Sequence, residues 1–174
     1  VCVRYSLGPG LFITVDGMEE PFNEEASLKV ETEMRRLVRL KLPLERSRIS
    51  IKDALSFYEQ DGQADKAKLL KWRRFSYFDV YQVDGYMDYF YGEMAPDTSY
   101  ADVFRVKYVN DGAVVLRMPR NDAPDVPSDY VDLPKLHAVF HQSDEWGKLM
   151  EWATVNDLNT HRQNGTIREV VRIN

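Results

Sequence analysis

The feature that most constrains the fold is a change in hydrophobic period along the chain. From Phe75 onward, aromatic and branched residues alternate with polar ones in "FSYFDVYQV", "YMDYFYG", "VFRVKYV" and "AVVLRMP". Turn signals at Asp84-Gly85 and at 110–112 separate these runs, and such turns need residues that tolerate positive φ. Alternation broken by short turns predicts strands that pair as antiparallel hairpins.

Upstream of Phe75 the pattern is mostly helical. The stretch "PFNEEASLKVETEMRRLVRLKL" predicts a helix capped by Asn23 and ended by Pro43, with acidic residues near its start and basic residues near its end. Four residues form the predicted core-facing stripe of this helix: Leu28, Met34, Leu37 and Val38.

Shorter elements complete the expected architecture. Leu11 to Val15 and the segment "LPLERSRIS" predict strands, while Ser50 with Asp53 predicts the start of a helix in "IKDALSFYEQ". A further helix is expected in "ADKAKLLKWRR", and another in "KLHAVFHQSDEWGKLMEW". The Pro- and Asp-rich residues 119–134 predict a linker. The expected fold class is α+β, with an antiparallel sheet, helices packed on one face of it and a C-terminal helical extension.

Charge and cysteine content exclude several function classes. The net charge is -5, which argues against a general nucleic-acid binder. Cys2 is the only cysteine, so an intrachain disulfide and a thiolate zinc cluster are both excluded, and a reducing cytoplasm is expected. No signal peptide or membrane-spanning run is visible. Because the chain starts inside a predicted strand, we expect it to be a piece of a longer polypeptide.

The segment "KAKLLKWRR" is the strongest basic stretch, and it contains no acidic residue. Its cations are Lys66, Lys68, Lys71, Arg73 and Arg74. One interpretation is the solvated face of a helix. The other is a contact with an anion or with the phosphate of a nucleotide.

Catalytic and metal motifs are sparse. His137 and His141 have the spacing of two metal ligands on one helical face, but no Glu follows His137, and the favoured interpretation is that they are two polar helix residues. The sequence has no G-x-S-x-G elbow and no phosphate-binding G-x-x-x-x-G-K-[ST] loop. It therefore offers no recognisable nucleophile and no P-loop for ATP.

The stretch "DYFYGEMAPDT" completes a resemblance. Together with "LGPGLFITVDG" and "PFNEEASLKVETEMRRLVRLKLPLERSRISIKDALSFYEQDGQADKAKLL", it resembles the second additional domain of threonyl-tRNA synthetases, over residues 5–118. In that family the domain is a zinc-dependent editing site that hydrolyses mischarged seryl-tRNA. Two of its ligands are a Cys and a His in a D-x-C-x-G-x-H turn, and an upstream histidine pair would precede Val1.

The resemblance assigns roles to individual residues of the turn. Asp88 and Gly92 match the family pattern, and Lys66 matches a lysine of the editing pocket. Phe90 stands in place of the cysteine and Met94 in place of the histidine. Phe has no lone pair and Met offers only a soft thioether, so neither suits Zn²⁺. We therefore expect a metal-free, non-catalytic site.

A second resemblance covers the whole chain. The segments "GYMDYFYGEMAPDTSY", "GAVVLRMP", "FHQSDEWGKLMEWATVNDLN" and "NGTIREVVRIN" resemble bacterial uridine kinase-like nucleoside kinases. In that family, a TGS domain and this synthetase-like domain precede a P-loop kinase domain. This implies a module at residues 1–118 that lacks its N-terminal part, a linker at 119–134, and a helical extension at 135–174 leading to a kinase domain. ATP and Mg²⁺ would serve that kinase domain, and this chain itself would need no cofactor.

The resulting hypothesis is a regulatory or substrate-binding module of a nucleoside kinase. Its expected partners are the downstream kinase domain and a nucleoside or nucleotide, with a homodimer also considered and with no membrane or nucleic acid. The candidate pocket comprises Lys66, Tyr86, Asp88, Tyr89, Phe90, Gly92 and Met94. Three alternatives stay open: these side chains fill the former zinc cavity as core, the chain is a zinc-dependent editing hydrolase, or it is a spacer or dimerisation domain that uses Trp146 and Trp152.

Overall fold

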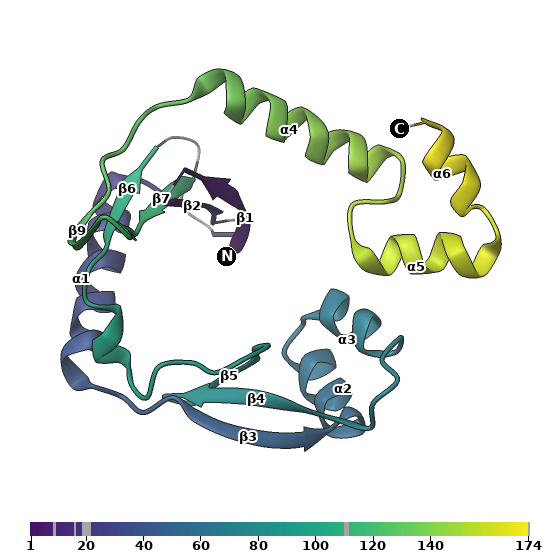
Figure 1. Cartoon of the computed structure of the whole chain (residues 1–174), viewed down its shortest axis with the longest axis horizontal. Coiled ribbons are helices and arrows are strands. Elements are labelled where there is room, and N and C mark those ends of the chain that lie inside the picture. The colour runs from purple at the N-terminus through teal and green to yellow at the C-terminus, as the bar shows by residue number, and fades with distance from the viewer. Residues whose placement is uncertain (9, 16, 19–21, 110–111, 174) are drawn as a thin grey trace. The chain divides into compact units, whose positions relative to one another are not determined.

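The computed structural model describes residues 1–8, 10–15, 17–18, 22–109 and 112–173 of the chain (Figure 1). Helices and antiparallel strands are both present, which confirms the α+β fold class. The chain divides into two compact units, each built from separate stretches of sequence. The first contains Val1–Glu45, Val83–Tyr86 and Gly92–Asp132, and the second contains Arg46–Gln82, Met87–Tyr91 and Leu133–Asn174. The predicted module of residues 1–118 is thus shared between both units.

The first unit is built on a four-stranded antiparallel sheet in the order β1-β2-β7-β6. Its strands are β1 (Cys2–Leu7), β2 (Gly10–Thr14), β6 (Arg105–Tyr108) and β7 (Ala113–Arg117). Phe12 in β2 lies opposite Val115 in β7, and both are buried together with Ala113. Gly112 precedes β7 with a φ of +78°, and a Cβ there would lie 3.3 Å from the carbonyl oxygen of Val15. The turn therefore requires glycine, while Asn110 and Asp111 lie outside the described residues.

Helix α1 (Glu24–Leu40) belongs to the same unit and lies against β6 and the short 3-10 helix η1 (Thr98–Ala101). Asn23 is its N-cap as predicted, because the Asn23 side chain accepts a hydrogen bond of 2.9 Å from the N–H of Ala26. At the other end Lys41 adopts a left-handed conformation with a φ of 51°, which stops the helix before Pro43.

The inward face of α1 differs from the predicted stripe. Leu28 was expected in the core but is 60% exposed, so that prediction is wrong. The buried residues of α1 are Ser27 and Glu31, one helical turn apart. The buried face of α1 is therefore rotated relative to the predicted one, because the carboxylate of Glu31, rather than the side chain of Leu28, contacts strand β6. The other predicted residues are half-buried: Met34, Leu37 and Val38.

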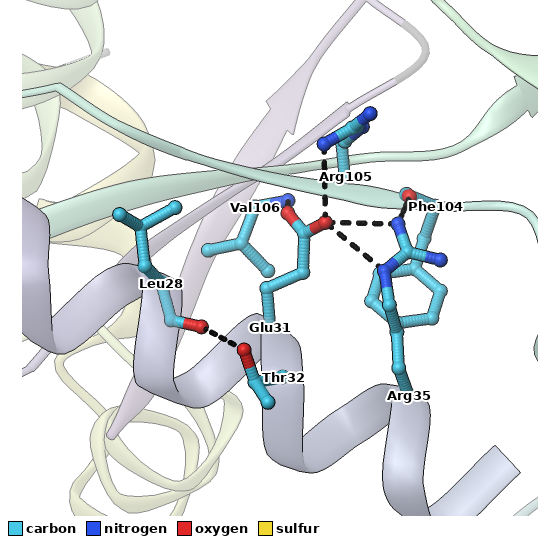
Figure 2. A network of polar contacts seen from close by, with 7 residues as sticks. All are labelled: Leu28, Glu31, Thr32, Arg35, Phe104, Arg105 and Val106. Carbon is cyan, nitrogen blue, oxygen red and sulfur yellow. Dashed lines mark hydrogen bonds and ion pairs between the residues drawn. The ribbon is translucent and has the colours of Figure 1, made fainter. Parts of the chain in front are cut away.

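Glu31 joins α1 to the strand β6 through several polar contacts (Figure 2). Its Oε2 accepts a hydrogen bond of 2.8 Å from the backbone N–H of Val106, and its Oε1 pairs with Arg35 at 2.8 Å and with Arg105 at 3.4 Å. Arg35 also donates to the carbonyl of Phe104 at 2.9 Å. Burial opposes ionisation of Glu31, but these donors outweigh it and lower the pKa of the carboxyl.

The second unit contains most of a three-stranded sheet in the order β3-β4-β5. Its strands are β3 (Glu45–Ser50), β4 (Tyr77–Val83) and β5 (Tyr86–Tyr89). The turn between β4 and β5 lies at Asp84-Gly85 as predicted, with both residues at positive φ. The nine strands of the chain that the structure describes lie in three separate sheets rather than one.

Two short helices cover this sheet, α2 (Ile51–Gln60) and α3 (Ala64–Leu70). Ser50 caps α2 as predicted, since its Oγ accepts from the N–H of Asp53 at 3.1 Å and donates to the Asp53 carboxylate at 2.7 Å. Helix α3 ends four residues before the predicted end at Arg74. The buried core of the unit comprises Ala54, Tyr58, Ala67, Leu70, Phe78 and Val80.

The predicted helical extension is present and belongs to the second unit. It comprises α4 (Pro134–Leu149), α5 (Val155–Asn164) and α6 (Ile167–Ile173). Thr154 and Asp157 form a capping box at the start of α5. The indole N–H of Trp72 donates to the Asn156 side chain at 3.0 Å, which ties α5 to the segment after α3. Within the described residues, no helix has the length and apolar character needed to cross a bilayer.

The predicted linker at 119–134 contains structure that its composition did not indicate. Strands β8 (Pro119–Arg120) and β9 (Ala123–Pro127) form a small antiparallel ribbon. Pro119 lies opposite Pro127 at its end. Prolines are compatible with such a ribbon because each strand has one edge on which no N–H is needed.

The buried carboxylate of Glu31 generates a stability prediction. Replacing Glu31 with Gln should reduce the free energy of unfolding at pH 7 by about 1–3 kcal/mol, because it weakens hydrogen bonds to charged donors. The matched control is Glu33→Gln on the exposed side of α1, where an ion pair with Arg36 is open to solvent and little change is expected. Urea denaturation of both variants measures the difference.

The same pair of variants has a predicted pH dependence. Because the pKa of Glu31 is lower in the folded chain, its stabilisation is present above the ordinary Glu pKa of about 4.3 and is lost as pH falls through the lowered folded value. The difference in the free energy of unfolding between the wild type and Glu31→Gln should therefore become smaller as the pH falls. A difference that is constant with pH, or no larger than that of Glu33→Gln, would contradict the role assigned to Glu31.

Candidate functional site

The centre of the candidate site is an ion pair between Lys66 in α3 and Asp88 in β5. The Lys66 ammonium lies 2.7 Å from Oδ1 and 2.6 Å from Oδ2 of Asp88, and the two side chains are 30% and 35% exposed. Asp88 Oδ1 also accepts from the Tyr89 backbone N–H at 2.8 Å and from the Tyr58 hydroxyl at 3.3 Å. The carboxylate is therefore held by a cation, a phenol and a backbone amide at once.

Two aromatic rings lie beside this ion pair. The Lys66 ammonium lies 5.4 Å from the ring centre of Tyr58 and 5.7 Å from that of Tyr89, both within the range of a cation–π interaction. The pKa of the Tyr58 hydroxyl is raised, mainly by burial and to a smaller extent by the negative charge of Asp88. Burial, Tyr91 and Asp88 likewise raise the pKa of Tyr89. Both phenols therefore stay protonated at neutral pH, so the Tyr58 hydroxyl remains a donor to Asp88.

A pocket of about 300 Å³ opens beside the ion pair. Its lining includes Lys66 and Tyr89, the segment that follows α3, and the first residue of α5, Val155. Arg73 in that segment places its guanidinium 5.1 Å from the ring centre of Phe78 and 5.4 Å from that of Tyr91. It also donates to the Tyr91 hydroxyl at 2.9 Å. The pocket thus combines aromatic walls with two cations.

Only part of the predicted site is brought together around this pocket. Lys66, Asp88 and Tyr89 are in mutual contact. Phe90 follows the end of β5, is 49% exposed and makes an edge contact with Tyr81. The other three predicted residues belong to the first compact unit: Tyr86, Gly92 and Met94.

The exposed fractions of three predicted residues test the alternative in which these side chains form part of the core. Tyr86 is 59% exposed, Phe90 49% and Met94 39%, so the interpretation of these three side chains as core is wrong. For Phe90 and Met94 the physical reason is that β5 ends at Tyr89, so the alternation that would bury every second residue does not continue into the turn. Tyr86 is the first residue of β5.

Trp72, Tyr91 and Val155 line the pocket but were not predicted as pocket residues, and Arg73 had two interpretations, a solvated helix face or an anion contact. Because α3 ends at Leu70, Trp72 and Arg73 leave the helical face. Trp72 donates to Asn156 in α5, and Arg73 contacts Phe78 in β4 and Tyr91 after β5. The run of basic residues in "KAKLLKWRR" was a partial signal for this site, because an anion contact was one of its two interpretations. The contribution of α5 depends on tertiary contacts and had no local signal.

Two of the three histidines make side-chain contacts with residues near them in the sequence. On α4, His141 Nε2 lies 3.4 Å from a Glu145 oxygen in the same helix. The ring nitrogens of His161 lie 2.8 Å from the Thr166 hydroxyl and 3.0 Å from the Glu151 carbonyl oxygen. Among the described residues, no group of three or more His, Cys, Asp or Glu side chains is placed to hold a metal ion.

Comparisons with known proteins agree with the first of the two resemblances. The chain is 27% identical over 108 residues to a threonine–tRNA ligase of Lawsonia intracellularis, an alignment that covers 60% of the chain and 17% of that protein. It is 32% identical over 115 residues to a threonine–tRNA ligase of Carboxydothermus hydrogenoformans, covering 59% of the chain and 17% of that protein. No family model matches the chain.

These similarities define the class of domain. The chain contains a threonyl-tRNA synthetase-like domain, and its α+β fold with antiparallel sheets is compatible with an additional domain of such an enzyme. The chain spans less than a fifth of the length of the curated relatives it matches, 17% in both cases.

The ion pair at the centre of the site can be tested by substitution. Lys66→Met should reduce the free energy of unfolding by roughly 1–2 kcal/mol, between the values typical of exposed and of buried pairs, because Asp88 loses its cation. Lys68→Met is the matched control in the same helix, where the ammonium lies 3.8 Å from Asp65 and both side chains are exposed. Equal stability of the two variants in urea denaturation would show that the Lys66 pair contributes nothing.

Proposed function

We propose that this chain is a metal-free, synthetase-like ligand-binding module of an ATP-dependent nucleoside kinase. In this proposal a downstream P-loop domain transfers the phosphoryl group, and the module binds a nucleoside or nucleotide and regulates that reaction. The observation that carries the binding role is the pocket beside Lys66 and Asp88, with its aromatic walls.

The engagement of Asp88 supports a non-catalytic role. A general base or a metal ligand needs an available lone pair directed at the substrate or the ion. Both oxygens of Asp88 contact the Lys66 ammonium, and one also accepts from the Tyr58 hydroxyl and the Tyr89 amide. This carboxylate thus acts as a structural anchor for α3.

Zinc-dependent editing of aminoacyl-tRNA is the alternative, and the residues do not fit it. Phe90 and Met94 occupy the positions where the resemblance places a cysteine and a histidine. A phenyl ring cannot ligate Zn²⁺, and a thioether binds it poorly. Without those ligands the chain cannot activate a zinc-bound water for hydrolysis.

The kinase assignment is supported by the second resemblance. It extends through α4, α5 and α6, whereas the matches to threonine–tRNA ligases cover 60% and 59% of the chain. ATP and Mg²⁺ would bind the downstream domain. We place the protein in the cytoplasm, with its own kinase domain as the main partner and with a homodimer as a further possibility, since Trp146 on α4 is 46% exposed.

Enzyme assays test this proposal directly. The full-length polypeptide should phosphorylate uridine or another nucleoside with ATP and Mg²⁺, whereas the 174-residue chain should not. The chain should also leave seryl-tRNA intact under conditions in which a zinc-containing threonyl-tRNA synthetase deacylates it. A full-length protein without kinase activity on any nucleoside would overturn the kinase assignment, and deacylation by the chain would revive the editing alternative.

A further inference from the structure

The pocket beside the Lys66–Asp88 ion pair has the size of a small-ligand site. Its volume of about 300 Å³ is at the lower end of the range for sites that bind metabolites. Its lining includes six residues that bear on ligand binding: Lys66, Trp72, Arg73, Tyr89, Tyr91 and Val155. None of the described residues that line the pocket is acidic.

The two cations of the pocket differ in how they are neutralised. The charge of Lys66 is balanced by Asp88, which contacts it with both oxygens. Arg73 instead contacts neutral groups, because its guanidinium lies over Phe78 and Tyr91 and donates to the Tyr91 hydroxyl. Within the described part of the chain, no carboxylate pairs with Arg73. The pocket therefore carries one positive charge that no acid balances.

Arg73 also has an unused donor. Its Nε atom is buried and has no hydrogen-bond partner among the described residues. A buried N–H of a charged group without an acceptor is costly. A phosphate group in the pocket would balance the charge of this guanidinium, which favours phosphate and carboxylate oxygens.

Aromatic faces lie next to this anion-binding position. Trp72 is 39% exposed and Tyr91 is 71% exposed, and both line the pocket. The Trp72 indole is fixed by its hydrogen bond to Asn156 in α5. An ordered, partly exposed indole next to a cation can stack a nucleobase while the cation binds the attached phosphate.

From these observations we infer that the pocket binds a nucleoside monophosphate, with its phosphate on Arg73 and its base against Trp72 or Tyr91. This inference deepens the proposed function and rests on it, because it takes the module to be ligand-binding. It differs from the pocket expected from the sequence, since Phe90 and Met94 take no part. It also requires α5 as well as the segment between α3 and β4.

Isothermal titration calorimetry of the 174-residue chain with UMP and with AMP tests the inference. A nucleoside monophosphate should bind at least about tenfold more tightly than the corresponding nucleoside, because only the phosphate reaches Arg73. Inorganic phosphate alone should bind more weakly than the nucleotide, because it lacks the stacking base. Equal affinity for uridine and UMP, together with equal affinity for adenosine and AMP, would overturn the inference.

Substitutions locate the site. Arg73→Gln should weaken nucleotide binding about tenfold or more, whereas Arg74→Gln, the exposed neighbour of the same charge, should leave it unchanged. Arg73→Lys keeps the positive charge but lacks the planar guanidinium, and should recover only part of the affinity. This variant also covers the case in which Arg73→Gln fails to fold. Nucleotide binding that survives in Arg73→Lys at full strength, or that is lost equally in Arg74→Gln, would overturn the placement on Arg73.

Failure of this inference can be separated from failure of the proposed function. If uridine binds the chain without any preference for UMP, the phosphate site is wrong while the ligand-binding module stands. If neither nucleosides nor nucleotides bind, the inference is wrong, and the kinase assay on the full-length polypeptide decides the parent class independently.

Discussion

The second unit depends on the contact between the Lys66 ammonium and the Asp88 carboxylate. Two short distances, 2.7 and 2.6 Å, connect α3 to β5 above the fully buried ring of Tyr58. Neither element is long enough to be stable alone, because α3 has seven residues and β5 has four. The charge pair and the aromatic rings around it hold these elements together, and the segment after α3 is thereby placed beside the pocket.

The first unit uses the same physical device. Glu31 on α1 accepts from the Val106 backbone N–H and pairs with Arg35 and Arg105, just as Asp88 accepts from a backbone N–H and pairs with Lys66. In both units an acidic side chain joins a helix to a strand and has its oxygens occupied by protein donors. Such carboxylates stabilise the fold, and their lone pairs are not available for acid–base chemistry or for metal binding. The proposed ligand-binding role is therefore assigned to the cations and the aromatic rings around them.

Local signals predicted the fold better than the site. Asn23 and Ser50 were assigned as caps because capping depends on neighbours within three residues, and the turn at Asp84-Gly85 depends on φ alone. The exposed Leu28 was misplaced because the inward face of α1 is decided by partners on β6, far away in sequence. Arg73 and Val155 meet in one pocket only through tertiary packing. A single sequence carries no local record of such a contact.

Zinc stoichiometry is the most direct test of the central claim that this synthetase-like domain has become a metal-free binding module. The 174-residue chain is equilibrated with excess zinc, desalted and analysed by inductively coupled plasma mass spectrometry, with Asp88→Ala as the comparison. The account predicts far less than one zinc per chain, with no difference between the two proteins. One zinc per wild-type chain that is lost in Asp88→Ala would contradict it.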